Sequence, residues 1–157
     1  MSVPLTQALD PREIRMTDTA AEVTRLAARC LDTLQERAGG SLDYSVASLT
    51  VIEEILAEAS EFYSELPEGQ IRAIVQEVGC YILCVGHRQF GGEYFWHDER
   101  AQPVLAVGEP EKHVAMMTWD KVHGRLSGDV GDNIPFFYDG FAERAATAPA
   151  GTRALYV

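Results

Sequence analysis

The stretch GCYILCVGHRQFGGEYFW, residues 79–96, decides the fold that this sequence predicts. Its first half is apolar or small on every helical face, a pattern typical of a helix that is buried on all sides. Gly91-Gly92 then ends that helix, and the aromatic run after it indicates a β-strand. We therefore expect a buried helix over residues 67–90 at the centre of the protein, with other elements packed on both flanks.

Two amphipathic helices are predicted ahead of the central one. Apolar residues recur at three- and four-residue spacing over residues 19–38 and again over residues 46–63. Gly39-Gly40 ends the first of these helices, and Ser45 is placed to cap the second. Residues 1–18 lack this periodicity, so we predict a poorly ordered N-terminal arm there and a single domain over residues 19–157.

The second half of the chain predicts a small sheet and two more helices. Strands are expected at residues 93–96, 103–107 and 113–117. Helices are expected at residues 119–127 and 134–146, and residues 154–157 can add a strand. The predicted fold class is α+β, with N-terminal helices, a buried central helix, a small antiparallel meander of about three strands and C-terminal helices.

The charge balance limits the partners. The chain of 157 residues has 24 acidic and 13 basic side chains, a formal net charge of −11. This charge repels phosphate backbones and anionic lipid headgroups, which argues against nucleic-acid and membrane partners. It would attract a basic protein, although acidity for solubility alone is the simpler explanation, and we favour it.

The cysteines and the apolar runs bear on location. The sequence shows no signal-peptide pattern and no apolar run of the ~20 residues that would span a bilayer. Three cysteines are an odd count, which fits free thiols in a reducing compartment. We expect a cytoplasmic protein.

Several short pieces from Leu42 onward carry a family resemblance. They are Leu42-Asp43-Tyr44-Ser45, Gly79-Cys80-Tyr81-Ile82, Gly91-Gly92-Glu93-Tyr94, Pro103-Val104-Leu105, Gly108, Arg125-Leu126, Gly128, Asp132 and Phe137-Tyr138. Together they resemble a group of small uncharacterised bacterial α+β proteins of the domain-of-unknown-function type, some of them immunity-like. The chain has Leu83 and Cys84 where that group has glycine and glutamate, so the resemblance implies a fold and supplies no catalytic residue.

Cys80, Cys84 and His87 lie on one side of the central helix, at positions i, i+4 and i+7. Two thiolates and an imidazole could bind zinc if His97 or Cys30 supplied a fourth ligand. Structural zinc sites usually place paired cysteines on a tight turn, however, and buried cysteines commonly act as small core residues. We favour the core interpretation and predict no metal and no cofactor.

His97, with Glu93 and Asp98 close by in sequence, is the enzymatic alternative. A carboxylate–imidazole pair across the predicted hairpin could serve a small metal-dependent or acid/base enzyme. The competing interpretation is a surface histidine beside solvated acids. The sequence contains no serine-nucleophile motif. It also contains no phosphate-binding glycine loop ahead of a helix.

The remaining signals favour a surface that binds a protein. The predicted helix over residues 46–63 presents an acidic face made of Glu53, Glu54, Glu58 and Glu61. Tyr94 and Trp96 share one face of the aromatic strand, which could meet a partner, although core packing of both faces is the more common arrangement and the one we favour for the strand. The leading prediction is a non-catalytic protein-binding module, of the immunity or accessory kind, with an acidic surface for a basic partner. A homodimer through the aromatic strand stays open.

Overall fold

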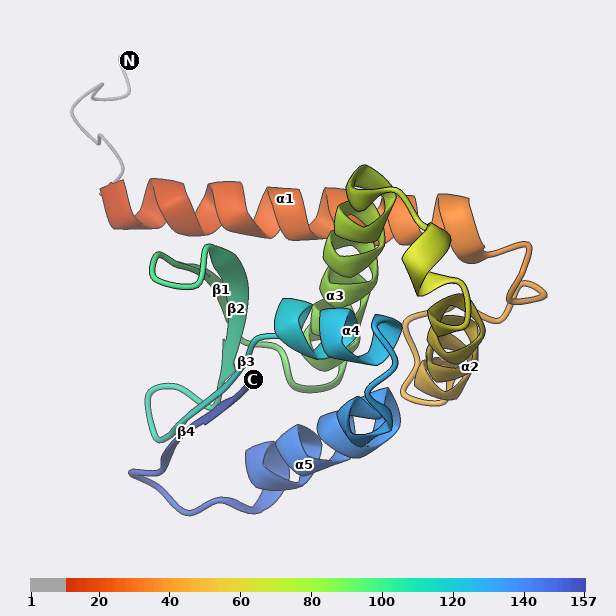
Figure 1. Ribbon diagram of the computed structural model, residues 1–157. Coiled ribbons are helices and arrows are strands. Elements are labelled where there is room, and N and C mark those ends of the chain that lie inside the picture. The colour runs from red at the N-terminus through yellow and green to blue at the C-terminus, as the bar shows by residue number, and fades with distance from the viewer. Residues whose placement is uncertain (1–10) are drawn as a thin grey trace.

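The computed structural model describes residues 11–157, and the first ten residues of the predicted arm lie outside this range. Within it the chain forms five α-helices and one four-stranded sheet, so the predicted α+β fold class is confirmed (Figure 1). The helices are α1 (Pro11–Leu34), α2 (Ser48–Ser60), α3 (Glu68–Phe90), α4 (Trp119–Leu126) and α5 (Ile134–Thr147). Short 3-10 helices, η1 (Tyr63–Glu65) and η2 (Val130–Asp132), lie between them. None of the helices in residues 11–157 is both long and apolar enough to cross a membrane.

The first helix begins earlier than the sequence pattern indicates. Residues 11–18 belong to α1 and not to an arm. Thr19 is buried, and Met16 and Ala20 are half-buried beside β1 (Glu93–His97). These residues pack on a strand that lies far away in sequence, so local periodicity does not show their helical role.

The second helix begins later than predicted. It starts at Ser48, and Ser45 lies in the turn ahead of it. The Ser45 hydroxyl still accepts a hydrogen bond from the Ser48 N–H at 3.2 Å. Ser45 thus satisfies one backbone donor, as a capping residue does, from a position outside the helix.

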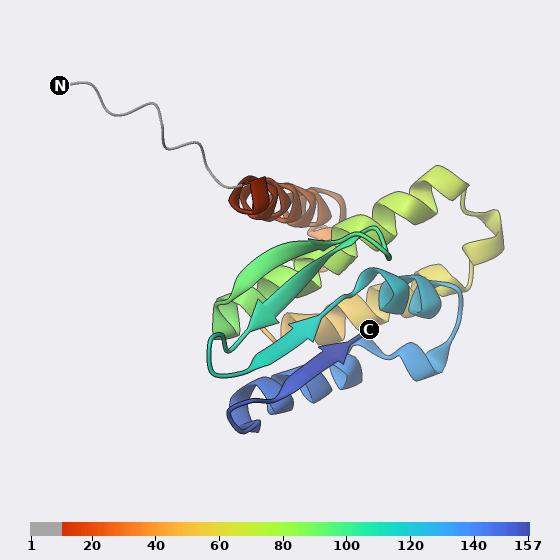
Figure 2. The same ribbon diagram turned by 90° about the vertical axis from the view of Figure 1, so that its left-hand side faces the viewer.

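The sheet joins a meander to a late parallel strand. Strands β1, β2 (Gln102–Val107) and β3 (His113–Met116) pair antiparallel in chain order, as predicted. The C-terminal strand β4 (Arg153–Tyr156) then pairs parallel with β3 at the edge of the sheet. Figure 2 shows the sheet in front, with the helices α3 and α5 behind it and α1 passing its β1 edge.

The central helix α3 is buried as the sequence predicts. Its residues from Glu77 to Leu83 are all buried, and Tyr81 is fully enclosed. The Tyr81 hydroxyl accepts a hydrogen bond from the Tyr44 N–H at 2.9 Å and lies 2.7 Å from the Ser48 hydroxyl. This buried phenol therefore ties α3 to the segment that leads into α2.

Gly79 explains how α4 approaches the central helix so closely. A Cβ atom at this position would collide with the side chain of Trp119 and crowd the hydroxyl of Thr118. That hydroxyl donates a hydrogen bond to the Gly79 carbonyl at 2.7 Å. The missing side chain of Gly79 makes room for the first turn of α4.

Candidate functional site

The predicted pair of Glu93 with His97 does not form. The two residues occupy opposite ends of β1, four residues and so about 13 Å apart along an extended strand. The His97 Nδ1 atom instead accepts a hydrogen bond from the Arg100 N–H at 3.2 Å, within the turn. Asp98 makes an exposed ion pair with Arg15 of α1 at 3.8 Å. The geometry therefore gives no support to an acid/base centre at His97.

The zinc alternative at Cys80, Cys84 and His87 gains no support from the structure either. Within residues 11–157, no three His, Cys, Asp or Glu side chains gather closely enough to hold a metal ion. Cys80 is fully buried, and burial raises the pKa of its thiol to about 12. A thiol held neutral in this way is a poor metal ligand, because the thiolate is the form that binds metal. Cys80 behaves as a core residue.

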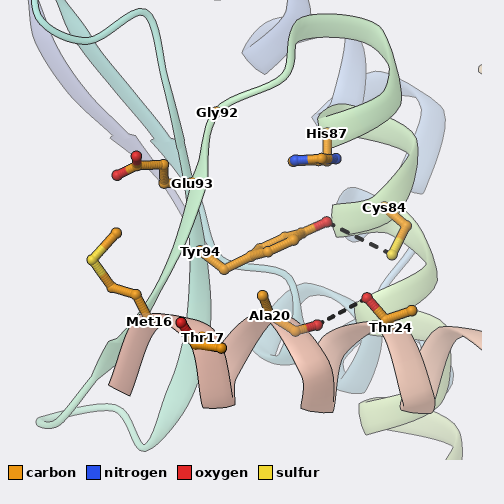
Figure 3. A pocket seen from close by; sticks show the side chains of 9 residues that line it. All are labelled: Met16, Thr17, Ala20, Thr24, Cys84, His87, Gly92, Glu93 and Tyr94. Carbon is orange, nitrogen blue, oxygen red and sulfur yellow. Dashed lines mark hydrogen bonds between the residues drawn. The ribbon is translucent and has the colours of Figure 1, made fainter. Parts of the chain in front are cut away.

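Cys84 differs from the other cysteines because it is half-buried and borders a cavity. Its sulfur accepts a hydrogen bond from the Tyr94 hydroxyl at 3.7 Å. Burial raises the pKa of the Cys84 thiol, and the Tyr94 hydrogen bond opposes this rise only partly. The cavity, which we name the thiol pocket, has a volume of about 390 Å³ (Figure 3). It is lined by Met16, Thr17, Ala20 and Thr24 of α1, Cys84 and His87 of α3, and Gly92, Glu93 and Tyr94 at β1.

Tyr94 is a buried residue that lines the thiol pocket and contacts both Cys84 and His87. Its side chain is only 7% exposed, so the prediction that Tyr94 contacts a partner is not supported. The ring of His87 stacks on the ring of Tyr94, with centroids 5.1 Å apart and planes 23° from parallel. Sequence patterns singled out Cys84, His87, Glu93 and Tyr94 separately, for three different reasons. The structure brings Cys84, His87 and Tyr94 together because the chain turns back at Gly91-Gly92 and β1 lies beside the last turns of α3, whereas the side chain of Glu93 at the cavity's edge points away from them (Figure 3).

Trp96 remains partly accessible. Its side chain is 41% exposed and meets Trp119 edge to face, with ring centroids 6.4 Å apart. Tyr94 and Trp96 therefore do not form one continuous aromatic surface, because only the second reaches solvent.

The predicted acidic face of α2 divides into two parts. Glu53 turns inward, and its carboxylate accepts hydrogen bonds from the Arg125 Nε atom at 2.5 Å and from the Ile134 N–H at 2.9 Å. Glu53 thus links α2 to α4 and α5 through buried hydrogen bonds. This corrects its predicted role at a surface. Glu54, Glu58 and Glu61 are exposed.

A second concave feature lies beside these exposed acids. It is a groove of about 510 Å³ between the C-terminal end of α1, α2 with η1, and the N-terminal half of α3, which meet in Figure 1. We name it the helical groove. It is lined by Thr33, Leu34, Arg37, Ile55, Leu56, Ala59, Phe62, Leu66, Gln70, Ala73, Ile74 and Glu77. A neighbouring hollow shares Arg37 and Ile55 with the groove and is lined by Glu54, Glu58 and Glu61.

The helical groove combines an apolar lining with negative charge. Phe62 at its edge is 55% exposed, so a large apolar side chain stands in solvent beside the apolar lining. Glu77 lines the groove although only 10% of its side chain is exposed, and its ion pair with Arg29 has a long separation of 3.5 Å. Arg37 is held by Glu58 through a hydrogen bond of 2.7 Å. Periodicity had indicated the apolar stripes of these helices but not the groove they leave.

The thiol pocket and the helical groove are two concave features that combine polar side chains with an apolar lining. What each can bind follows from its own residues. Comparison of the chain with protein-family models, with curated proteins and with solved structures finds no match.

Proposed function

We propose that the protein is a non-catalytic protein-binding module that takes a basic amphipathic helix of a partner into the helical groove. The observation that carries the proposal is Glu77, a carboxylate held nine-tenths buried in an otherwise mostly apolar groove. An immunity or accessory role, in which the module holds a basic partner protein, is consistent with this proposal. With three free thiols in the chain, the cytoplasm is the proposed location.

The lining of the groove suits a helix. Ile55, Leu56 and Ile74 supply an apolar floor between helices, and Phe62 stands at the rim. An amphipathic helix buries its apolar face in such a groove through side chains spaced three and four residues apart. Burial of Phe62 against that helix would remove a large apolar side chain from water, which is the usual source of hot-spot energy.

The negative charge in and beside the groove favours a basic partner. Glu77 is already largely removed from water, so a lysine or arginine that reached it would gain a charge-assisted hydrogen bond at little further desolvation cost. Glu54, Glu58 and Glu61 add exposed negative charge alongside. Together with the net charge of −11 these acids would speed the encounter with a cationic segment.

A defined peptide tests the proposal. The probe is a synthetic amphipathic helix of leucine and lysine, about four turns long, with its leucines at the three- and four-residue spacing of one helical face. Fluorescence anisotropy should show saturable binding to the intact protein. Phe62→Ser and Glu77→Gln should each weaken binding about tenfold, since each removes one anchor.

Two further peptides and two charge variants make the test specific. A scrambled leucine–lysine peptide and a leucine–glutamate helix should bind far more weakly. Reversal of Glu54, Glu58 and Glu61 to lysine should slow association, whereas reversal of the exposed Glu99, Glu111 and Glu143 changes the net charge equally and should slow it much less. Equal binding of the scrambled peptide, or equal losses in the two triple variants, would show that net charge alone attracts the probe and would refute the groove.

A further inference from the structure

Beyond partner binding in the helical groove, we infer that the open edge of the sheet at β4 binds an extended, partly acidic segment of a partner protein by strand addition. In this mode a peptide continues the sheet through main-chain hydrogen bonds, and its side chains supply the specificity. The β4 edge and the helical groove share no residue.

Strand β4 offers free backbone groups along one side. It lies at an edge of the sheet, and the carbonyls of Thr152 and Tyr156 accept hydrogen bonds of 2.8 Å each from the chain at β3. Because successive residues of a strand point their backbone groups to opposite sides, those of Arg153 and Leu155 face away from β3. The opposite edge differs, since α1 passes along β1 (Figure 2). The β4 edge is therefore the one that can receive another strand.

The side chains along this edge are exposed and carry positive charge. Leu155 is 50% exposed, and Arg153 is exposed as well. Residues 144–157 contain two arginines and no acidic side chain, in a chain whose formal net charge is −11. Arg153 forms no ion pair with the side chains that the structure describes. Its guanidinium can therefore take a carboxylate from another molecule through charge-assisted hydrogen bonds.

Helix α5 extends this surface below the strand. A Cβ atom on Gly140 would lie 3.5 Å from the Tyr156 ring, so this part of α5 packs beside β4. Phe136 and Arg144 lie four residues before and after Gly140, on the same side of the helix. Phe136 is 78% exposed, and Arg144 is exposed too. Since α5 and β4 run in opposite directions (Figure 1), the surface has a basic end at the start of β4 and an apolar end where β4 finishes.

The charge of this surface favours a partner segment over a second copy of the chain. An arginine on an edge strand discourages the association of identical edges. A strand that places a carboxylate opposite Arg153 gains a favourable cross-strand pair instead. In antiparallel pairing, such a segment has its acidic residues at its C-terminal end, and its apolar residues ahead of them meet Leu155 and Phe136.

A short synthetic peptide tests the inference. The probe has about six residues, the usual length of a strand, and is rich in valine with two glutamates at its C-terminal end. Fluorescence anisotropy should show saturable binding to the intact protein. The same peptide with lysine in place of both glutamates should bind at least about tenfold more weakly, although the net charge of the protein would attract it.

Backbone methylation tests strand addition directly. Only every second N–H of an added strand faces β4. Two further versions of the probe carry N-methyl groups on the odd or on the even residues. One version should lose binding, and the other should keep it.

Three substitutions in the protein complete the test. Arg153→Glu should weaken probe binding about tenfold, whereas Arg72→Glu, exposed on α3, makes the same change of net charge and should leave it nearly unchanged. Leu155→Pro removes an N–H that faces outward, so the fold should persist while binding falls at least about tenfold. Leu155→Ala keeps this N–H and should lose less. Circular dichroism checks the fold of each variant.

Several results would overturn the inference. They are the absence of saturable binding, equal binding of the lysine version, equal binding of the two N-methyl versions, and equal effects of Arg153→Glu and Arg72→Glu. Sedimentation that shows a dimer which Leu155→Pro abolishes would assign the edge to a second copy instead. None of these outcomes changes the titrations of the leucine–lysine helix with the helical groove, so the two proposals fail independently.

Discussion

Glu53 of α2 and Arg125 of α4 form an ion pair in which both side chains are nearly nine-tenths buried, and the second Glu53 oxygen accepts the N–H of the first residue of α5. One carboxylate therefore joins three helices. Because its partners are already removed from water, loss of this group would leave a buried guanidinium and a buried N–H without an acceptor.

We predict that Glu53→Ala lowers the free energy of unfolding by about 3–5 kcal/mol. The measurement is urea unfolding followed by circular dichroism. Glu54→Ala, at the next position on the same helix but exposed, should change stability by less than about 0.5 kcal/mol. Similar small effects of both substitutions would contradict the bracing role of Glu53.

Gly79→Ala should destabilise the protein by about 1–3 kcal/mol, since the new methyl group has no room beside Trp119 and Thr118. The control is Gly69→Ala on the same helix, where a Cβ atom meets open space. That substitution should be neutral or stabilise by up to about 1 kcal/mol, because alanine is the better helix former. Chemical denaturation of both variants measures the contrast, and equal effects would argue against the close approach of α4.

The buried thiols make stability depend on pH in the alkaline range. Burial raises the pKa of Cys80 from 9.0 to about 12, and that of Cys30 likewise to about 12. The unfolded chain therefore releases these protons first, and the contribution that is present below pH 9 is lost as pH rises toward 12. Each thiol adds up to about 1.4 kcal/mol per pH unit to this fall in the free energy of unfolding.

Cys80→Ala separates the thiol from other titrating groups. The variant should start from a lower stability at pH 7, because it leaves a small cavity. Its stability should then fall less steeply with pH than that of the unchanged protein. Urea unfolding at several pH values above 8 gives both slopes, and parallel slopes would show that Cys80 does not titrate as its burial requires.

Glu77→Gln should separate binding from stability. The ion pair of Glu77 with Arg29 is long, and the Arg29 side chain is 61% exposed, so its loss should cost less than about 1 kcal/mol of stability. The same substitution should weaken binding of the leucine–lysine helix about tenfold. Thermal unfolding and anisotropy on one preparation measure both. A large loss of stability with unchanged peptide binding would make Glu77 a structural residue.

Local patterns were sufficient to predict most of the fold. The burial of α3 follows from the apolar run around Tyr81 and Ile82, and the three-stranded meander follows from alternating apolar residues between turn signals. The start of α1 was missed because Met16 and Ala20 are stabilised by β1, a contact between residues far apart in sequence.

The sites were harder to predict than the fold, for the same reason. Helical periodicity placed Glu53 with the other acids of its helix, and only the position of Arg125 72 residues later shows that it points inward. The link between Cys84 and Tyr94 depends on the turn at Gly91-Gly92, which fixes how the strand returns along the helix. Amino-acid spacing gives the face of an element but not the neighbour that this face meets.

The packing of Trp119 against the central helix gives the protein its own optical signal. Burial raises the pKa of the Cys80 thiol and the indole N–H of Trp119 opposes that rise, although this buried N–H has no hydrogen-bond partner among the described residues. Trp96, the second of the two tryptophans, meets the same indole edge to face. Thiols quench indole emission at short range, so the native protein should be dim. Separation of α4 from α3 should therefore increase the Trp119 emission of an unlabelled sample.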